Sequence, residues 1–179
     1  MSKSKVKRSA TGYRFGIVAA RFNAQVTGKL LTACVETLRE HGVDTRNIRA
    51  VRVPGAFEIP LVARTMASSN QYDAIICLGA VIRGDTPHFE YICAEVSRGI
   101  GQAALDTEIP IIFGVLTTET VAQAVERADP RRFNRGGEAA NVAIEMVTLM
   151  RMIRGAADKV TGSEELTRQN GQARSRRKR

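Results

Sequence analysis

Four short apolar runs alternate with longer segments of helical periodicity, and this alternation limits the possible folds more than any other feature of the chain. The runs cover residues 14–20, 48–53, 74–78 and 111–116. The helical segments cover residues 27–41, 59–68, 87–106, 119–128 and 137–154, and Gly42 and Gly155 follow the first and the last as C-terminal caps. Strands and helices in this order are typical of a parallel sheet covered by helices. The sequence therefore predicts an α/β fold with a four-stranded parallel sheet.

Positive charge is concentrated at the two ends of the chain, which carries a net charge of +9 over 179 residues. Residues 1–14 hold five basic and no acidic side chains, and residues 155–179 hold seven basic and three acidic ones, so the block between them is neutral. We expect a flexible basic segment over 1–12, one catalytic domain over 13–154 and a disordered basic tail over 155–179. Such a tail is compatible with weak nucleic-acid contact or with solubilisation alone.

The sequence also indicates where the protein resides. It has no run of 18 apolar residues and no apolar stretch near its first residues, so we expect a cytoplasmic protein without a membrane partner. Cys34, Cys77 and Cys93 form no CxxC pair, and no His lies at ligand spacing. We therefore expect three buried thiols in a reduced compartment, with neither a disulfide framework nor a structural metal.

In a parallel sheet, the carboxyl ends of all strands lie at one edge, and ligands bind in the crevice outside that edge. Function is therefore expected in the segments 21–23, 54–58, 79–88 and 117–118. Two of the nine aromatic residues, Phe22 and Phe57, fall there and could stack on a planar ligand. No Lys, Ser or Cys nucleophile lies in these segments. The set is better suited to orienting two reactive substrates than to covalent catalysis.

The segment after the third run is the most informative of these. Thr86 followed by Pro87 predicts a helix N-cap with proline at the first helical position, so free backbone N–H groups and the helix dipole would favour a phosphate group. His88 would then lie where the dipole favours a neutral imidazole able to exchange a proton, although a His that only satisfies a loop carbonyl is equally compatible. Asp85 would repel a phosphate unless its side chain turns away or caps the helix. His41, beside Gly42, is predicted to be a helix C-cap.

Six motifs in order resemble the 6,7-dimethyl-8-ribityllumazine synthase family, the penultimate enzyme of riboflavin synthesis. They are GIVAARFN at 16–23, VPGAFEIP at 53–60, LGAVIRGDTPHFEY at 78–91, PIIFGVLTT at 110–118, QAVERA at 123–128 and NRGGEAANVAIEM at 134–146. The resemblance covers residues 13–154. It implies a flavodoxin-like three-layer α/β/α sandwich and the condensation of 5-amino-6-(D-ribitylamino)uracil with 3,4-dihydroxy-2-butanone 4-phosphate, without cofactor or metal.

The resemblance also implies roles for individual residues. Phe22 would stack on the pyrimidine, and His88 would be the proton shuttle. Main-chain groups and the Glu58 carboxylate would hold the uracil and ribityl chain, with contributions from Ala56, Phe57, Glu58, Ala80, Val81 and Ile82. Asp85 and Thr86 would bind the phosphate.

The family's assembly supplies the remaining roles. Phe113, together with Arg127 binding the phosphate, would come from a neighbouring subunit, in a pentamer or a cage of pentamers. Arg135 would contact the substrate; it stands where family members usually carry Lys, and Arg keeps the charge but changes the donor geometry. The loop 129–133 lacks the glycine- and lysine-containing pattern of many cage-forming members. Two alternatives to an enzyme are a non-catalytic flavin- or lumazine-binding protein and a cage whose basic tail binds nucleic acid. A mere binding protein could lose His88 and Arg127, and both are present.

Overall fold

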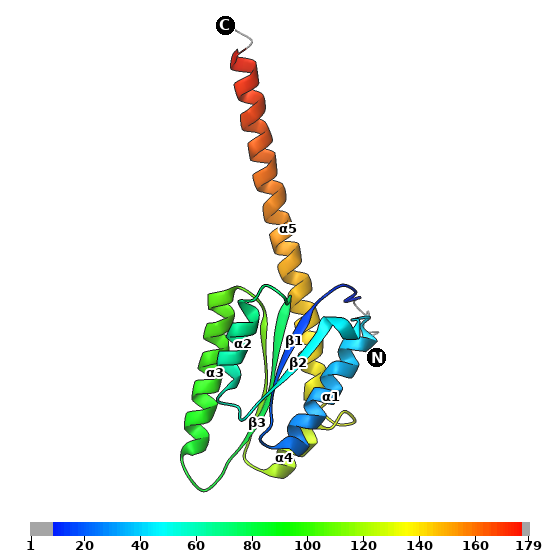
Figure 1. The fold of residues 1–179 in the computed structure, drawn as a ribbon, viewed down its shortest axis with the longest axis vertical. Coiled ribbons are helices and arrows are strands. Elements are labelled where there is room, and N and C mark those ends of the chain that lie inside the picture. Colours follow the sequence, from blue (N-terminus) through cyan, green and yellow to red (C-terminus); the bar gives the residue numbers. More distant parts are fainter. Residues whose placement is uncertain (1–8, 177–179) are drawn as a thin grey trace, which may run out of the picture. The chain divides into compact units, whose positions relative to one another are not determined.

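The computed structural model describes residues 9–176, and the side chains of residues 9–155. Its strands are β1 (Phe15–Ala20), β2 (Ile48–Val53), β3 (Ala74–Ile82) and β4 (Ile111–Thr118). They form one parallel sheet in the order β2-β1-β3-β4 (Figure 1). The predicted four-stranded parallel sheet is confirmed. Its strand order reverses between β1 and β3, because the chain crosses from β2 over β1 to reach β3.

Helices cover both faces of the sheet and complete the three predicted layers. They are α1 (Ala24–Glu40), α2 (Ile59–Ala67), α3 (His88–Thr107), α4 (Val121–Ala128) and α5 (Arg135–Arg176), with a short 3-10 turn at Thr45–Asn47. Helices α2 and α3 lie on one face, and α1 and α4 lie on the other (Figure 1). The first turn of α5 packs against α1, because a Cβ on Gly136 would lie 2.2 Å from the carbonyl oxygen of Leu30.

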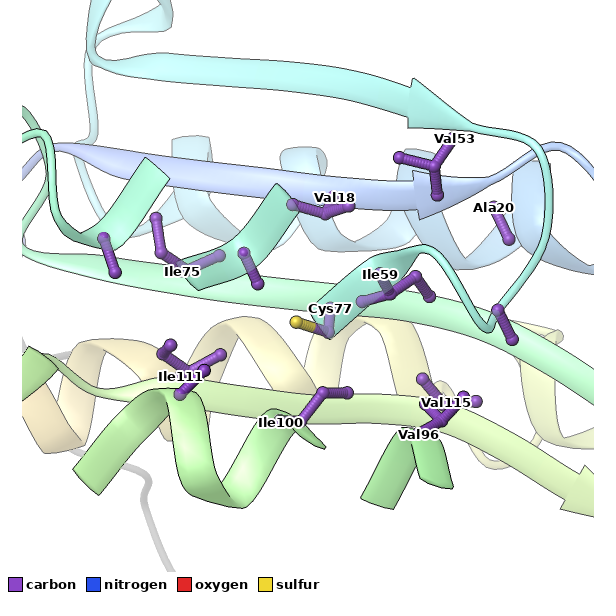
Figure 2. Packing of buried hydrophobic residues seen from close by; sticks show 14 residues of the cluster. Val18, Ala20, Val53, Ile59, Ile75, Cys77, Val96, Ile100, Ile111 and Val115 are labelled. Carbon is purple, nitrogen blue, oxygen red and sulfur yellow. The ribbon is translucent and has the colours of Figure 1, made fainter. Parts of the chain in front are cut away.

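The core follows from the alternation of side chains along each strand. Val18 of β1 and Ile75 and Cys77 of β3 point to the same face, where they pack against Ile59 of α2 and Val96 of α3 (Figure 2). Strand β1 is buried along its whole length, as expected for a central strand covered on both faces.

The cysteines and the predicted cap mostly follow the sequence analysis. Cys34 and Cys77 are buried as predicted, whereas Cys93 is half-buried. Burial raises the pKa of the Cys34 thiol to about 12, so this group stays protonated. His41 is the C-cap of α1, as predicted, with its Nδ1 2.9 Å from the Thr37 carbonyl oxygen, and Gly42 follows with a φ of 86°.

Strands β3 and β4 run further than the sequence predicts. Their expected ends were Leu78 and Leu116, but the two strands pair with each other up to Ile82 and Thr118. Strand β1 stops earlier, since its last pair with β3 joins Ala19 to Leu78. The residues 79–82 therefore lie on a strand that extends beyond the end of its neighbour and not in a loop.

The described chain begins in contact with α1 and ends in a long helix. Ala10 is buried, and its N–H donates to the His41 carbonyl oxygen at 2.8 Å, so the described chain is anchored from this residue on. Residues 9–145 belong to one compact unit, and the described residues from Met146 belong to a second, which is helical. The predicted end of the last helix at Arg154 is wrong, because α5 continues to Arg176. Residues 1–8 of the basic N-terminal segment and the basic side chains of the tail lie outside the described residues. Among described helices, none is long and apolar enough to cross a membrane.

Candidate active site

A cavity of about 710 Å³ opens at the carboxyl ends of β1, β2 and β3. This is the edge where the strand order reverses, the usual ligand site of an open α/β sheet. Nine residues predicted from the sequence line it: Phe22, Ala56, Phe57, Glu58, Ala80, Val81, Ile82, Thr86 and His88. Five further residues complete the lining, namely Gly55, Gly84, Phe89, Tyr91 and Ile92. Residues distant in sequence therefore share one pocket.

Phe22 is held in the cavity by the backbone around it and not by packing. Its side chain is 72% exposed, and its N–H donates to the Pro54 carbonyl oxygen at 3.0 Å. The next residue, Asn23, adopts the left-handed conformation with φ 58°. The Asn23 side-chain amide donates to the Ala80 carbonyl oxygen at 2.9 Å. The turn after β1 is thereby tied to both β2 and β3, and the exposed ring of Phe22 can take up a planar ligand.

The segment after β2 forms a closed turn around Glu58. The Glu58 Oε2 accepts a hydrogen bond from the Gly55 N–H at 2.8 Å, and the N–H of Ile59 donates to the Ala56 carbonyl oxygen at 3.1 Å. Glu58 is also the N-cap residue of α2, although its side chain makes no capping bond to that helix. Its carboxylate therefore organises the turn that exposes Phe57, whose side chain is 57% exposed.

The third wall is the extended part of β3. The N–H of Ile75 donates to the Pro110 carbonyl oxygen, and the N–H of Arg83 donates to the Thr118 carbonyl oxygen. The main-chain N–H and C=O groups of the odd-numbered residues of β3 therefore face β4. The main chain of Ala80 and Ile82 consequently faces the side where β1 has already ended. Peptide N–H and C=O groups on this side can meet a polar planar ligand as a neighbouring strand would.

The segment from Gly84 to His88 forms the fourth wall, and its helix start differs from the prediction. Helix α3 begins at His88 with Pro87 as the N-cap residue, and no side-chain hydrogen bond caps it. The predicted capping role of Thr86 is therefore wrong, because the helix begins one residue later than predicted and Pro87 occupies the N-cap position. Thr86 and His88 both line the cavity, while Asp85, between them in sequence, is not among its lining residues.

Three predicted residues lie away from the cavity of their own chain. Phe113 is on β4 beside Cys77 of β3, and its side chain is 45% exposed. Arg127 on α4 donates to the Gln123 carbonyl oxygen at 3.2 Å, and Arg135 at the start of α5 pairs with Glu138. The two guanidinium groups lie 5.6 and 5.9 Å from the Phe133 ring centroid. One chain thus brings Arg127 and Arg135 together, but not onto its own cavity.

Two residues next to the cavity lining, Asn23 and Arg83, were not predicted from the sequence to have a role. Asn23 fell in a segment predicted to be functional, and Asn is the residue that most readily accepts the left-handed conformation after glycine. Arg83 follows β3, and its guanidinium contacts both Glu90 and Glu119. Hydrogen bonding to Arg83 lowers the pKa of the Glu90 carboxyl, which keeps this carboxylate ionised. The local sequence does not predict the contact between Arg83 and Glu119, since the two residues are 36 positions apart.

The cavity lies where the strand order of an open parallel sheet reverses, and aromatic side chains, main-chain groups and one imidazole line it. Such a site is typical of α/β enzymes that bind small molecules. The model of one family, 6,7-dimethyl-8-ribityllumazine synthase, matches residues 12–151. The chain belongs to this family, as the six sequence motifs indicate. It is an enzyme of riboflavin biosynthesis, a transferase acting on small-molecule substrates.

Proposed function

We propose that the cavity at the carboxyl edge of the sheet is the place where the ribitylaminouracil and the butanone phosphate condense to 6,7-dimethyl-8-ribityllumazine, phosphate and water. The observation that carries this proposal is that His88 and Thr86 line the same cavity as Phe22, Phe57 and Glu58. Phe22 and Phe57 enclose the flat pyrimidine. Main-chain groups of Ala56 and of Ala80, Val81 and Ile82 hold the uracil, and Glu58 accepts from the ribityl hydroxyls.

The chemistry needs proximity and proton transfer more than a covalent catalyst. The pyrimidine's own amine attacks the ketone of the phosphate substrate, and loss of water gives an imine. His88 then takes up and returns a proton while the phosphate leaves, and the ribitylamino nitrogen closes the second ring with loss of a second water molecule. An imidazole within hydrogen-bond distance of the reacting atoms supplies general acid–base catalysis. Holding the two substrates together removes the entropic part of the barrier.

The phosphate is held partly by a second subunit in this proposal. Asp85 and Thr86 belong to the loop that meets the phosphate through main-chain N–H groups, and Arg127 and Arg135 of a neighbouring chain approach it. Support comes from the positions of these arginines and of Phe113, which lie off the cavity of their own chain, with the Phe113 side chain 45% exposed. A pentamer, alone or within a cage, brings them to the next cavity.

The remaining proposals concern the surroundings of the enzyme. In this proposal the protein acts in the cytoplasm, residues 13–154 form the catalytic domain, and the basic tail over 155–179 extends from it. Repetition of this tail in an oligomer would give weak attraction to nucleic acid through avidity. Catalysis does not depend on that contact in the proposal.

The test of the function is to mix the two substrates with the purified protein and follow the fluorescent lumazine product. We expect His88→Ala to lower kcat by a factor near the low end of the roughly 10²–10⁴ range of general acid–base groups, because water partly replaces the imidazole. The matched control is Glu95→Gln, which removes an exposed ion pair with Arg98 on the same helix and leaves kcat unchanged. An unaltered kcat in His88→Ala would return this residue to a structural role.

A further inference from the structure

Arg83 occupies the boundary between β3 and the loop that lines one wall of the cavity. Its backbone N–H donates to the Thr118 carbonyl oxygen at 3.0 Å, and its Nε donates to the Glu119 carboxylate at 2.5 Å. Its Nη1 donates to the Glu90 carboxylate. The guanidinium carbon lies 4.2 Å from the ring centroid of Phe89, which lines the cavity. One side chain thus contacts the first turn of α3 and the segment after β4.

The partners of Arg83 are themselves fixed. Glu119 follows β4 directly, and its N–H donates to the Gln123 side chain at 3.0 Å, next to the start of α4. The N–H of Glu90 donates to the Pro87 carbonyl oxygen at 3.1 Å in the first turn of α3. Arg83 consequently joins the carboxyl end of β3 to two helix N-termini, one of which carries His88.

The loop between these anchor points has little packing of its own. Residues 84–88 are all exposed, and a Cβ placed on Gly84 would meet no atom within 4 Å. Helix α3 also lacks a side-chain N-cap bond. The position of Thr86 and His88 relative to the cavity is therefore set at the ends of the loop, where the contacts of Arg83 lie.

We propose that Arg83 is a positioning residue, which holds the loop 84–88 and the first turn of α3 so that Thr86 and His88 face the substrates. The inference rests on the proposed roles of Thr86 and His88. Arg83 itself does not line the cavity, and both carboxylates engage its guanidinium, so it acts through the loop.

The loss of Arg83 should affect catalysis more than the stability of the fold. The side chains of Arg83, Glu90 and Glu119 are 37%, 53% and 59% exposed, and exposed ion pairs contribute little to folding. A shift of about 1 Å in a catalytic group, by contrast, lowers a rate by up to about 100-fold. The loss of Arg83 is therefore expected to appear in kcat and in the KM of the butanone phosphate, with an almost unchanged Tm.

The experiment compares Arg83→Ala, Arg83→Lys and the control Arg98→Ala, which removes an exposed ion pair within α3, the helix that carries Glu90. For Arg83→Ala we expect kcat to fall by about 10- to 100-fold, the KM of the phosphate substrate to rise more than that of the pyrimidine, and the Tm to stay the same. Arg83→Lys keeps the positive charge but loses the planar guanidinium that donates to two carboxylates, so its kcat should lie between those of the wild type and Arg83→Ala. Arg98→Ala should behave as the wild type.

Two further measurements make the inference refutable. Hydrogen–deuterium exchange of the peptide 83–92 should become faster in Arg83→Ala, and in a His88→Ala background the same substitution should lower kcat much less than in the wild type. Unchanged exchange, or faster exchange with an unchanged kcat, would overturn the positioning role. If His88→Ala alone leaves kcat intact, the proposed proton shuttle fails, whereas faster exchange and a raised KM of the phosphate substrate would still support Arg83 as the anchor of the loop.

Discussion

Asn23 combines an unusual backbone conformation with a contact across the sheet. Its φ is 58°, and its side-chain amide holds the Ala80 carbonyl oxygen. Asn23→Ala should destabilise the fold by about 1–3 kcal/mol, because alanine disfavours the left-handed region and one part-buried hydrogen bond is lost. Asn23→Gly should destabilise it less, since glycine accepts this conformation.

Urea denaturation compares the two Asn23 variants, and the KM of the pyrimidine reports on the neighbouring Phe22. We expect this KM to rise in both, because both lose the bond that fixes the turn. Equal stability of the alanine and glycine variants would show that the backbone conformation at residue 23 carries no strain.

Sequence position alone identified the cavity residues in the segments that follow strands. Phe22, Phe57 and His88 could be named because the carboxyl ends of parallel strands meet at one edge. The roles of Asn23 and Arg83 could not be predicted, because each depends on a partner distant in sequence, Ala80 at 57 residues and Glu119 at 36. Glu58 was expected to bind substrate, and its bond to Gly55 adds a role in shaping the turn.

Among the elements, the contact of α1 with the start of α5 leaves no room for a side chain at Gly136. A Cβ there would lie 2.2 Å from the Leu30 carbonyl oxygen, which belongs to rigid helix backbone. Gly136→Ala should therefore force the helices apart and destabilise the fold by about 1–3 kcal/mol, as overpacking does.

The control for Gly136 is Gly101→Ala in α3, where a Cβ would meet nothing within 4 Å. Alanine favours a helix over glycine by about 1 kcal/mol, so this variant should be neutral or more stable. Thermal unfolding of both variants measures the difference. If Gly136→Ala unfolds like the wild type, the two helices are not packed as closely as the structure shows.

The boundaries of elements were less predictable than their existence. Apolar periodicity located all four strands, but 79–82 extend β3 because β4 continues to pair with them after β1 has ended. The apolar residues 80–82 are compatible with such an extension, but the point where pairing ends depends on the neighbouring strand. Gly155 is a plausible helix end in sequence, yet α5 continues past it, since a single glycine weakens a helix without stopping it.

At the scale of the whole molecule, the proposed site spans two subunits. Phe22 lines the cavity, while Arg127 lies on α4 beside Phe133. Phe22→Ala and Arg127→Ala should each be impaired, but subunits of the two variants that are mixed in denaturant and refolded together should regain activity, because some sites then combine two intact halves. The measurement is lumazine formation by the mixed assembly.

Each variant refolded alone serves as the control for this mixing experiment, and native mass determination verifies that mixed oligomers have formed. Activity that stays at the level of the single variants in verified mixed oligomers would mean that both residues act in one chain's site. A single chain cannot reveal this arrangement from its sequence pattern, since nothing in the spacing of Phe113, Arg127 and Arg135 tells which copy they serve.

The extension of β3 beyond β1 has a consequence for how this pocket changes over evolutionary time. Ala80 and Ile82 present peptide groups where β1 has ended, so part of the proposed recognition surface is made of atoms that every residue type except proline possesses in full. Point mutations at these positions alter the contour of the wall but leave its donors and acceptors in place. In the proposed site, hydrogen bonding along this wall would therefore tolerate most substitutions, and it would depend on the length of the strand more than on the identity of its side chains.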